Sequence, residues 1–458
     1  MMTIALPMVV SQACDTVMIF TDRLFLSKLH PELMNAAMGG GLTVFMMMSF
    51  FLGLTGYASA LTAQYLGAGR KKNCAVVTTQ ALLFSAAAYL PILLSRPLGH
   101  RLFAVMGIHE LQLGPQKIYF DILLYGVIFS LARNCLSCFF SGIGRTGVVM
   151  TASFTAMAVN AVLNYILIFG KFGMPALGIR GAAYGTLVGG ASGLFVLAAA
   201  YLRKQNRDEF SIAQAWRFDR EVAKKLWRFG SSTGLEFFLN IMAFNGMVMT
   251  FHSCGLAAAT AATIVLNWDM VSFVPLVGVE IGVTSLVGRY MGAGRPDIAH
   301  RSVMSGLKLA LLYSSVILAL FLGIPGQLIE LFRPAGSDEI FNRALPTALF
   351  MLRMAAFYVL CDAVLVIFIG ALRGAGDTLW AMGTSVSVHW LMVGTLTVVL
   401  RVLGRPPETG WVFLVWIFIA YSFVVFFRYR LGKWRTLRVV EKEPVAVVVD
   451  GFHEPVDL

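Results

Sequence analysis

Long apolar stretches dominate the chain, and short breaks of polar residues, glycine or proline separate them. A helix needs about 20 mainly apolar residues to cross the hydrocarbon core of a bilayer, and twelve stretches meet that requirement. The predicted spans are residues 3–25, 41–66, 76–95, 117–139, 147–169, 179–202, 228–251, 257–290, 302–325, 344–371, 378–401 and 411–430. The first begins almost at Met1 with no small-residue cleavage site after it, so we interpret it as a retained helix and not as a signal peptide.

The composition indicates a membrane protein rather than a soluble domain. Of the 458 residues, 58% are hydrophobic and 13% are charged, whereas charged residues make up about 25% of average soluble domains. The mean hydropathy is +0.76. The predicted fold class is therefore an all-α integral membrane protein with twelve transmembrane helices.

The formal net charge of +12 reflects membrane topology and not a site for nucleic acid. Most of the Lys and Arg residues lie in alternate predicted loops and in the C-terminal tail, notably at 70–72, 203–228, 373 and 428–442. Loops rich in Lys and Arg stay on the cytoplasmic side of a membrane. We therefore expect a multi-pass protein of the inner (plasma) membrane, with both termini in the cytoplasm and the lipid bilayer as its surroundings.

An internal repeat divides the chain into two halves. The segment QYLGAGR at 64–70 recurs in the second half as RYMGAGR at 289–295, and GIGRT at 142–146 recurs as GAGDT at 374–378. Each half would hold six helices, so both halves start on the same side of the membrane, and a pseudo-two-fold axis along the membrane normal relates two six-helix bundles. The predicted parts are an N-lobe at 1–202, a cytoplasmic interlobe linker at 203–225, a C-lobe at 226–430 and a cytoplasmic tail at 431–458.

Acidic residues inside the predicted spans are the strongest indication of function. An acid at bilayer depth costs roughly 2.5–3.5 kcal/mol even on lenient insertion scales, so such residues mark functional sites. Asp362 lies deep in the tenth span with Tyr358 one helical turn before it, which places a carboxylate and an aromatic ring on one face and outlines a cation site. The same half also buries Glu236, Asp269 and Glu280. Buried acids without partners favour a bound proton or cation, as an exchanger of protons or sodium ions requires.

The first half places polar residues on helix faces. Asp15 and Asp22 lie seven residues apart in the first span, nearly on one face. Asn160 and Asn164, four residues apart in the fifth span, carry amide oxygens that suit either a hard cation or hydrogen bonds between helices. In the sixth span every fourth residue from Gly181 to Gly193 is a glycine, which predicts the close approach of another helix.

Several segments together resemble the multidrug and toxic compound extrusion (MATE) transporters, in particular the NorM-type branch within the MOP flippase superfamily. They are the YLGAGR and YMGAGR ends, the GALRGAGDT close of the tenth helix, the ALPMVVSQ opening, and the LNYILIFG and GIRGAAYGT segments. The resemblance covers about residues 3–430. It implies two six-helix bundles that form a V-shaped cleft, and the export of bulky, often cationic, amphipathic compounds in exchange for Na⁺ or H⁺.

The resemblance also implies roles for single residues. Counted from Pro7 and Gln12, Asp22 falls on the acid of the family's first helix, while the CDTVM string around Asp15 is similar to the family motif but lies seven residues too early. The implied N-lobe cation site is Asp22, Asn160, Asn164 and Thr186, and the implied C-lobe cation site is Glu236, Tyr358 and Asp362, with Na⁺ or H⁺ as the ion. The departures from the family pattern are Arg23, which could be a counter-ion for Asp22, Arg133, and the additional acids Asp269 and Glu280.

Two other functions stay open from the residues alone. A flippase for lipid-linked saccharides shares the architecture and would line its cleft with bases facing a diphosphate, for which Arg23 and Arg133 are the only support. An intramembrane enzyme would need two carboxylates beside one scissile bond, yet Asp22 is separated from Glu236 and Asp362 by the repeat. We predict a monomeric secondary active transporter that is not an enzyme. It would take drug-like small molecules and use no cofactor or transition metal, only Na⁺ or H⁺ as coupling ion.

Overall fold

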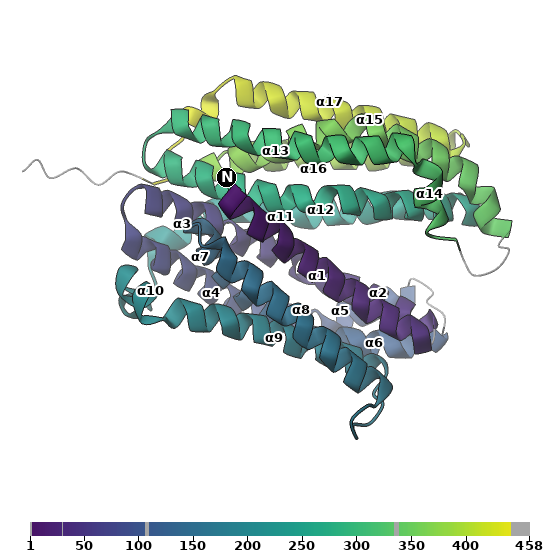
Figure 1. The fold of residues 1–458 in the computed structure, drawn as a ribbon, viewed down its shortest axis with the longest axis horizontal. Coiled ribbons are helices and arrows are strands. Elements are labelled where there is room, and N and C mark those ends of the chain that lie inside the picture. Colours follow the sequence, from purple (N-terminus) through teal and green to yellow (C-terminus); the bar gives the residue numbers. More distant parts are fainter. Residues whose placement is uncertain (1, 30, 106–109, 334–338, 441–458) are drawn as a thin grey trace, which may run out of the picture.

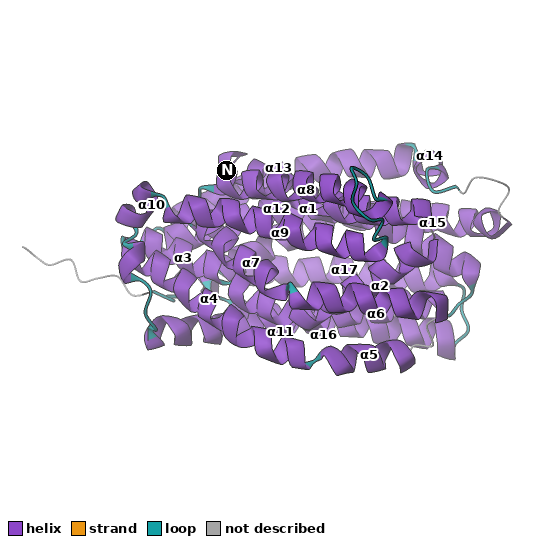
Figure 2. Cartoon of the chain, turned by 90° about the horizontal axis from the view of Figure 1, so that it is seen from below, coloured by secondary structure: helices purple, strands orange, loops and turns teal. Residues whose placement is uncertain are grey.

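The computed structural model describes residues 2–29, 31–105, 110–333 and 339–440, and its regular structure in these ranges is helical throughout (Figure 2). The N-terminal bundle consists of α1 (Met2–Leu29), α2 (Pro31–Gly56), α3 (Ala58–Gly67), α4 (Lys71–Leu94), α5 (Arg96–Val105), α6 (Glu110–Tyr125), α7 (Val127–Gly142), α8 (Thr146–Phe169) and α9 (Ile179–Leu202). The C-terminal bundle consists of α11 (Arg220–His252), α12 (Leu256–Gly292), α13 (Pro296–Gly323), α14 (Pro325–Glu330), α15 (Glu339–Ala375), α16 (Thr378–Thr397) with the π-helical turn η2 (Val398–Val402), and α17 (Pro407–Arg430). Between and after the bundles lie α10 (Lys204–Glu209), η1 (Ile212–Gln214) and η3 (Lys433–Thr436).

The two bundles lie against each other at one end and diverge toward the other. Figure 1 shows them close together where α3 and α10 lie, and apart toward the end that carries α14. Within the described ranges, eleven helices are long and apolar enough to cross a membrane, and the bent pair α6 and α7 supplies the twelfth span. The prediction of twelve spans is therefore confirmed. The predicted span 117–139 corresponds to this pair, which bends by 47° at its break.

The bend between α6 and α7 lies at a glycine that is packed against α9. Gly126 separates the two helices, and a Cβ atom at this position would lie 1.8 Å from Leu187 Cδ2 of α9. The absence of a side chain at this residue leaves room for the tip of the Leu187 side chain at the break. Hydrophobicity alone does not reveal the bend, because both arms of the pair are apolar.

At two of the prolines inside the spans, Pro7 and Pro275, a neighbouring helix supplies a hydrogen bond in place of the missing one. The helix α1 is continuous through Pro7. Pro7 has no N–H group, so the carbonyl oxygen of Thr3 lacks its usual partner within the helix. It accepts a long hydrogen bond from Thr146 Oγ1 instead (3.4 Å). In α12 the carbonyl oxygen of Val271, four residues before Pro275, accepts a hydrogen bond from the Tyr313 hydroxyl of α13 (2.8 Å).

The repeated sequence ends meet at the contact between the bundles. A Cβ atom at Gly67 would lie 1.7 Å from the carbonyl oxygen of Arg289, and a Cβ atom at Gly292 would lie 1.9 Å from that of Gln64. The register of the repeat maps Gln64 onto Arg289 and Gly67 onto Gly292. One contact is thus the symmetry mate of the other, as the predicted pseudo-two-fold axis requires.

A second pair of contacts obeys the same symmetry. A Cβ atom at Gly53 of α2 would lie 2.7 Å from the Cα atom of Gly234 in α11, and one at Gly278 of α12 would lie 2.7 Å from the Cα atom of Val9 in α1. The same register relates Gly53 to Gly278 and Val9 to Gly234. The two bundles therefore pack through equivalent helices, with α2 on α11 and α1 on α12.

The segment between the bundles is held by polar contacts. Glu209 of α10 pairs with Lys71 Nζ (3.0 Å) and with Arg145 Nη2 (2.7 Å). The hydrogen bond from Lys71, together with the one from Arg145, lowers the pKa of the Glu209 carboxyl below its usual value, although partial burial opposes the shift. Farther along, Gln80 Nε2 of α4 donates to the carbonyl oxygen of Arg217 (2.8 Å). The helix α11 begins at residue 220, inside the predicted linker.

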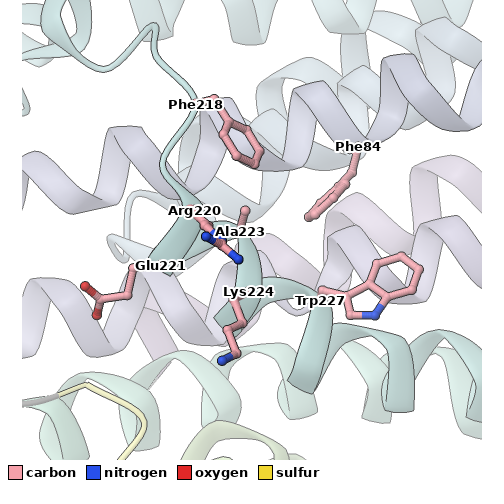
Figure 3. Close-up of a pocket in the computed structure, with 7 residues that line it drawn as sticks. All are labelled: Phe84, Phe218, Arg220, Glu221, Ala223, Lys224 and Trp227. Carbon is pink, nitrogen blue, oxygen red and sulfur yellow. The ribbon is translucent and has the colours of Figure 1, made fainter.

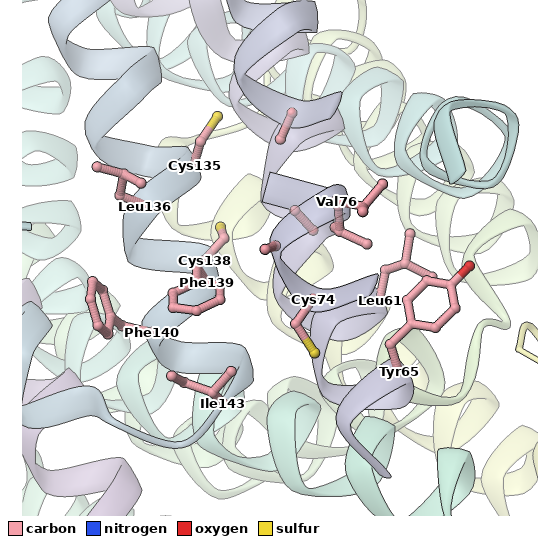
Figure 4. Packing of buried hydrophobic residues seen from close by; sticks show 14 of the residues in the cluster. Leu61, Tyr65, Cys74, Val76, Cys135, Leu136, Cys138, Phe139, Phe140 and Ile143 are labelled. Atoms are coloured by element: carbon pink, nitrogen blue, oxygen red, sulfur yellow. The ribbon is translucent and has the colours of Figure 1, made fainter. Parts of the chain in front are cut away.

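A large apolar cluster lies beneath the segment between the bundles, at the end of the molecule where the two bundles meet. Figure 4 shows its side chains from α3, α4 and α7, among them Leu61, Cys74 and Phe139, which are fully buried. The tail residues Val439 and Val440 belong to the same cluster, so the chain after α17 returns to the contact between the bundles. The predicted tail beyond residue 440 lies outside the described residues.

Candidate cation sites

The four residues predicted for the N-lobe site come together between α1, α8 and α9. Thr186 Oγ1 donates to Asp22 Oδ2 (2.6 Å), and Asn164 Nδ2 donates to Asp22 Oδ1 and to Asn160 Oδ1, the latter at 3.1 Å. Asp22 is 4% exposed, and both asparagines are fully buried. In the described part of the chain, no lysine or arginine forms an ion pair with Asp22.

The spacing of glycines explains why these helices come so close. A Cβ atom at Gly185 would lie 2.1 Å from Asn164 Oδ1, and one at Gly189 would lie 2.8 Å from the Cβ atom of Asn160. The predicted close approach at this glycine stripe is confirmed. It presses α9 onto the face of α8 that carries the asparagines and brings Thr186 within reach of Asp22.

Asn164 retains an unused acceptor. Its Oδ1 atom is buried and has no hydrogen-bond partner. A carboxylate, a hydroxyl and amide oxygens are the ligands that hard cations such as Na⁺ prefer, and the same carboxylate can instead take a proton. The donor set of this cluster therefore fits either coupling ion.

The other acid of the first helix has a different partner. Arg133 Nη2 of α7 donates to Asp15 Oδ1 (2.6 Å) and to the Ser153 hydroxyl of α8 (2.9 Å). Asp15 is thus neutralised by an arginine, whereas Asp22 is held by uncharged groups. The expected counter-ion Arg23 interacts electrostatically with Asp22 but forms no direct ion pair with it within the described residues.

The predicted C-lobe residues occupy two neighbouring positions between α12 and α15. The Tyr358 hydroxyl donates to Asp269 Oδ1 (2.5 Å). Asp362 follows one turn later and is 3% exposed. Its carboxylate makes no hydrogen bond among the described residues, and its charged neighbours are the acids Asp269 and Glu280.

A bridging arginine completes the C-terminal set. Arg373 Nη1 donates to Glu280 Oε1 (2.6 Å), and Arg373 Nη2 donates to Glu236 Oε1 (2.9 Å). Glu236 is 2% exposed, and its Oε2 atom has no hydrogen-bond partner. The prediction that Arg373 is a basic loop residue is wrong. Because α15 extends to residue 375, the side chain is part of the helix and points back into the bundle.

The three residues predicted for the C-lobe cation site, Glu236, Tyr358 and Asp362, are not bonded directly to one another in the structure. Tyr358 and Asp362 share a helix face, as predicted, but Glu236 is joined to the group by Arg373 and Glu280 and not by a bond to Asp362. In the described part of the chain, no group of three or more His, Cys, Asp or Glu side chains could hold a metal ion. A metal cation bound in either bundle would therefore need amide, hydroxyl or backbone oxygens as well.

Comparison with known proteins identifies the family. The MatE family model matches residues 7–166 and 233–394, one segment in each half of the repeat. The chain belongs to the MatE family. The MatE segments contain most of the polar residues described above, but Thr186 lies between them.

Curated relatives resemble the chain over most of its length. A protein named "Probable multidrug resistance protein NorM" from Bradyrhizobium diazoefficiens is 28% identical over 390 residues, which cover 84% of this chain and 83% of that protein. "Multidrug resistance protein PmpM" from Pseudomonas aeruginosa is 25% identical over 405 residues, with 85% and 81% covered.

Solved structures share the MatE fold. One is an outward-facing multidrug resistance MATE transporter of the MOP superfamily, with a TM-score of 0.85, 20% identity, and coverage of 94% of this chain and 95% of that chain. Another is a MOP superfamily transporter from Pyrococcus furiosus, described as having a binding pocket of reverse polarity, with a TM-score of 0.85, 21% identity and the same coverage. These likenesses confirm the two-bundle fold of twelve helices.

Proposed function

We propose that this MatE-family protein is a cation-coupled antiporter that exports bulky, often cationic, amphipathic compounds by alternating access, with Na⁺ or H⁺ as the coupling ion. The observation that carries the proposal is the environment of Asp362. This carboxylate is 3% exposed, has no hydrogen bond among the described residues and faces the acids Asp269 and Glu280. A carboxylate in such a place is stable only when a proton or a cation accompanies it.

The charge balance of the C-terminal bundle supports a cationic cargo. Glu236, Asp269, Glu280 and Asp362 are linked by contact or by electrostatic proximity, and Arg373 is the arginine that pairs with two of them. Four carboxylates and one guanidinium leave a deficit of positive charge when the acids are ionised. A coupling ion and a cationic compound can both supply that charge.

The N-terminal cluster supplies a second place for the coupling ion. Asp22 is buried and bonded to Asn164 and Thr186, which carry no charge. If Na⁺ were bound to the Asp22 carboxylate, the Asn164 amide could rotate so that its unpaired oxygen faces the ion. Binding of H⁺ would neutralise the same carboxylate without a change of partner.

The proposal extends to the substrates, the location and the oligomeric state of the protein. The names of the relatives support drug-like small molecules as substrates. The distribution of Lys and Arg supports an inner-membrane location with both termini in the cytoplasm. We further propose that the protein works as a monomer, uses no cofactor besides the coupling ion and catalyses no chemical reaction. The flippase alternative loses part of its basis, because Arg133 is paired with Asp15 and is not free to bind a diphosphate.

An efflux assay in vesicles tests the proposal. Purified protein is reconstituted with a fluorescent lipophilic cation, and either a Na⁺ gradient or a pH gradient is imposed. We expect one gradient to drive efflux, and we expect Asp362→Asn and Glu236→Gln each to abolish it while the protein still folds and inserts. Asp208→Asn, an exposed acid of α10, is the matched control and should retain wild-type efflux. Wild-type efflux in both site variants, or no response to either gradient, would refute cation coupling at this site.

A further inference from the structure

A groove lies where the segment between the bundles meets the lateral surface of the helices. Its volume is about 630 Å³. Figure 3 shows Phe84 of α4 on one side, Phe218 before α11 on another, and Trp227 of α11 on a third, with Arg220 and Lys224 beside them. The groove thus joins a helix of the N-terminal bundle to a helix of the C-terminal bundle.

Aromatic side chains form the apolar walls of this groove. The rings of Phe84 and Trp227 contact each other with centroids 6.0 Å apart and planes inclined by 52°. Trp227 is 53% exposed and Phe218 is 67% exposed. Exposed tryptophan and other aromatic rings at the end of a span are typical of the boundary between lipid tails and headgroups.

The rim of the groove carries positive charge. Glu221, the acid at this place, is paired with Lys225 (2.7 Å) and so does not neutralise the other bases. Arg220 and Lys224 are exposed, and neither forms an ion pair within the described residues. Two bases thus remain available to an anionic ligand.

The backbone around the groove is fixed by hydrogen bonds. Gln80 of α4 holds the carbonyl oxygen of Arg217 (2.8 Å), and the Asp219 side chain caps α11 by accepting from the Val222 N–H (3.0 Å). These bonds place the segment from 216 to 220 along α4, next to the apolar surface of the span. The groove is therefore a preformed feature with an apolar interior and a basic rim.

We propose that this groove binds an anionic phospholipid from the leaflet on this side of the membrane. The phosphate would pair with Arg220 and Lys224, and the glycerol and upper acyl chain would lie against Phe84, Phe218 and Trp227. A basic pocket between helices at the cytoplasmic side is a typical site for an anionic headgroup. The basic rim repels the cationic compounds of the proposed export function, so the site is distinct from the export pathway and does not rest on that function.

Quenching of tryptophan fluorescence by brominated lipids tests the proposal on the full chain. The protein is reconstituted in vesicles of phosphatidylcholine that contain either brominated phosphatidylglycerol or brominated phosphatidylcholine, and Trp227→Phe identifies the part of the quenching that belongs to Trp227. We expect a preference for phosphatidylglycerol that falls about fivefold for each charge removed in Arg220→Gln and Lys224→Gln, since a base near the surface contributes ~1 kcal/mol.

The matched control removes two exposed bases of the same end that lie outside the groove, with Lys204→Gln combined with Lys433→Gln. We expect the wild-type preference in this control. An equal loss in the control, an unchanged preference in Arg220→Gln/Lys224→Gln, or quenching that Trp227→Phe leaves intact would each overturn the proposal. If the double groove variant does not fold, Lys224→Gln alone decides by the same criteria.

Discussion

Single residues determine the charge of the C-terminal bundle, and Arg373 has the largest effect. It pairs with Glu236 and Glu280, which lie on two different helices. Removing one partner of a buried ion pair is strongly destabilising, because the remaining charge keeps its cost of burial without the attraction. Asp362, on the same helix as Arg373, has no such partner among its charged neighbours. The same bundle therefore contains two acids that share one arginine and a third acid, Asp362, that has no basic partner and is free for an exchangeable cation.

We expect Arg373→Met to destabilise the folded protein by about 3 kcal/mol, because two buried carboxylates lose their base. Adding Glu236→Gln and Glu280→Gln to this variant should restore most of the loss, since the amides remove the unpaired charges. Unfolding by denaturant titration in detergent gives both values. If the triple variant is no more stable than Arg373→Met, the cost does not come from uncompensated charge.

The sequence predicts these residues to different extents for physical reasons. Asn160 and Asn164 are found because a spacing of four residues puts them on one helix face, and the buried acids stand out from an apolar background. Arg373 escapes prediction because it comes directly before the glycine-rich sequence GAG at 374–376, which resembles a loop although the helix continues to residue 375. The pairing of Tyr358 with Asp269 depends on how α15 is placed against α12, which no local pattern encodes.

Among the elements, the contact between α8 and α9 shows how glycine spacing builds a site. The stripe from Gly181 to Gly193 faces α8, and Gly185 touches the side chain of Asn164. The sequence predicts this contact because the period of four marks one face of the helix. It does not predict the bend at Gly126, since the chain on both sides of this residue is apolar and the hydrophobic pattern continues through it.

We expect Gly185→Ala to weaken the binding of the coupling cation on the order of tenfold, since overpacking of a close contact typically costs ~1–3 kcal/mol. The new methyl group would push Asn164 away from Asp22. Gly190→Ala, on the same helix with nothing within 4 Å of the added Cβ atom, is the matched control and should behave as wild type. The cation concentration for half-maximal efflux measures both. Equal values for the two variants would argue against a role of the α8–α9 contact in the site.

The whole molecule is organised by the repeat, which the sequence predicts well. Two short matching segments, QYLGAGR and RYMGAGR, are enough to infer two bundles, and Gln64, Gly67, Arg289 and Gly292 then form symmetry-related contacts in the structure. The sites do not obey this symmetry equally. The N-terminal cluster contains one acid, Asp22, held by neutral groups, and the C-terminal cluster contains four acids with Arg373. The repeat therefore predicts the framework, but the distribution of charge has to be determined within each half.

The asymmetry of charge leads to a prediction for the exchange mechanism. A carrier that held cation and drug independently would leak, so the two should compete for the negative field around Asp362 and Glu236. By linkage, the cation must weaken drug binding by the same factor by which the drug weakens cation binding. The driving force suffices: one elementary charge that crosses the membrane provides about 2.3 kcal/mol per 100 mV, enough for a gradient of roughly fiftyfold in an uncharged substrate.

Binding isotherms of a lipophilic cation on the purified protein, recorded at rising Na⁺ and at falling pH, measure the coupling. We expect the affinity to fall in at least one series, and to respond less in Asp362→Asn. An affinity that is unchanged in both series would rule out direct competition, and coupling would then have to pass through Asp22 and its neighbours in the other bundle without a shared charge.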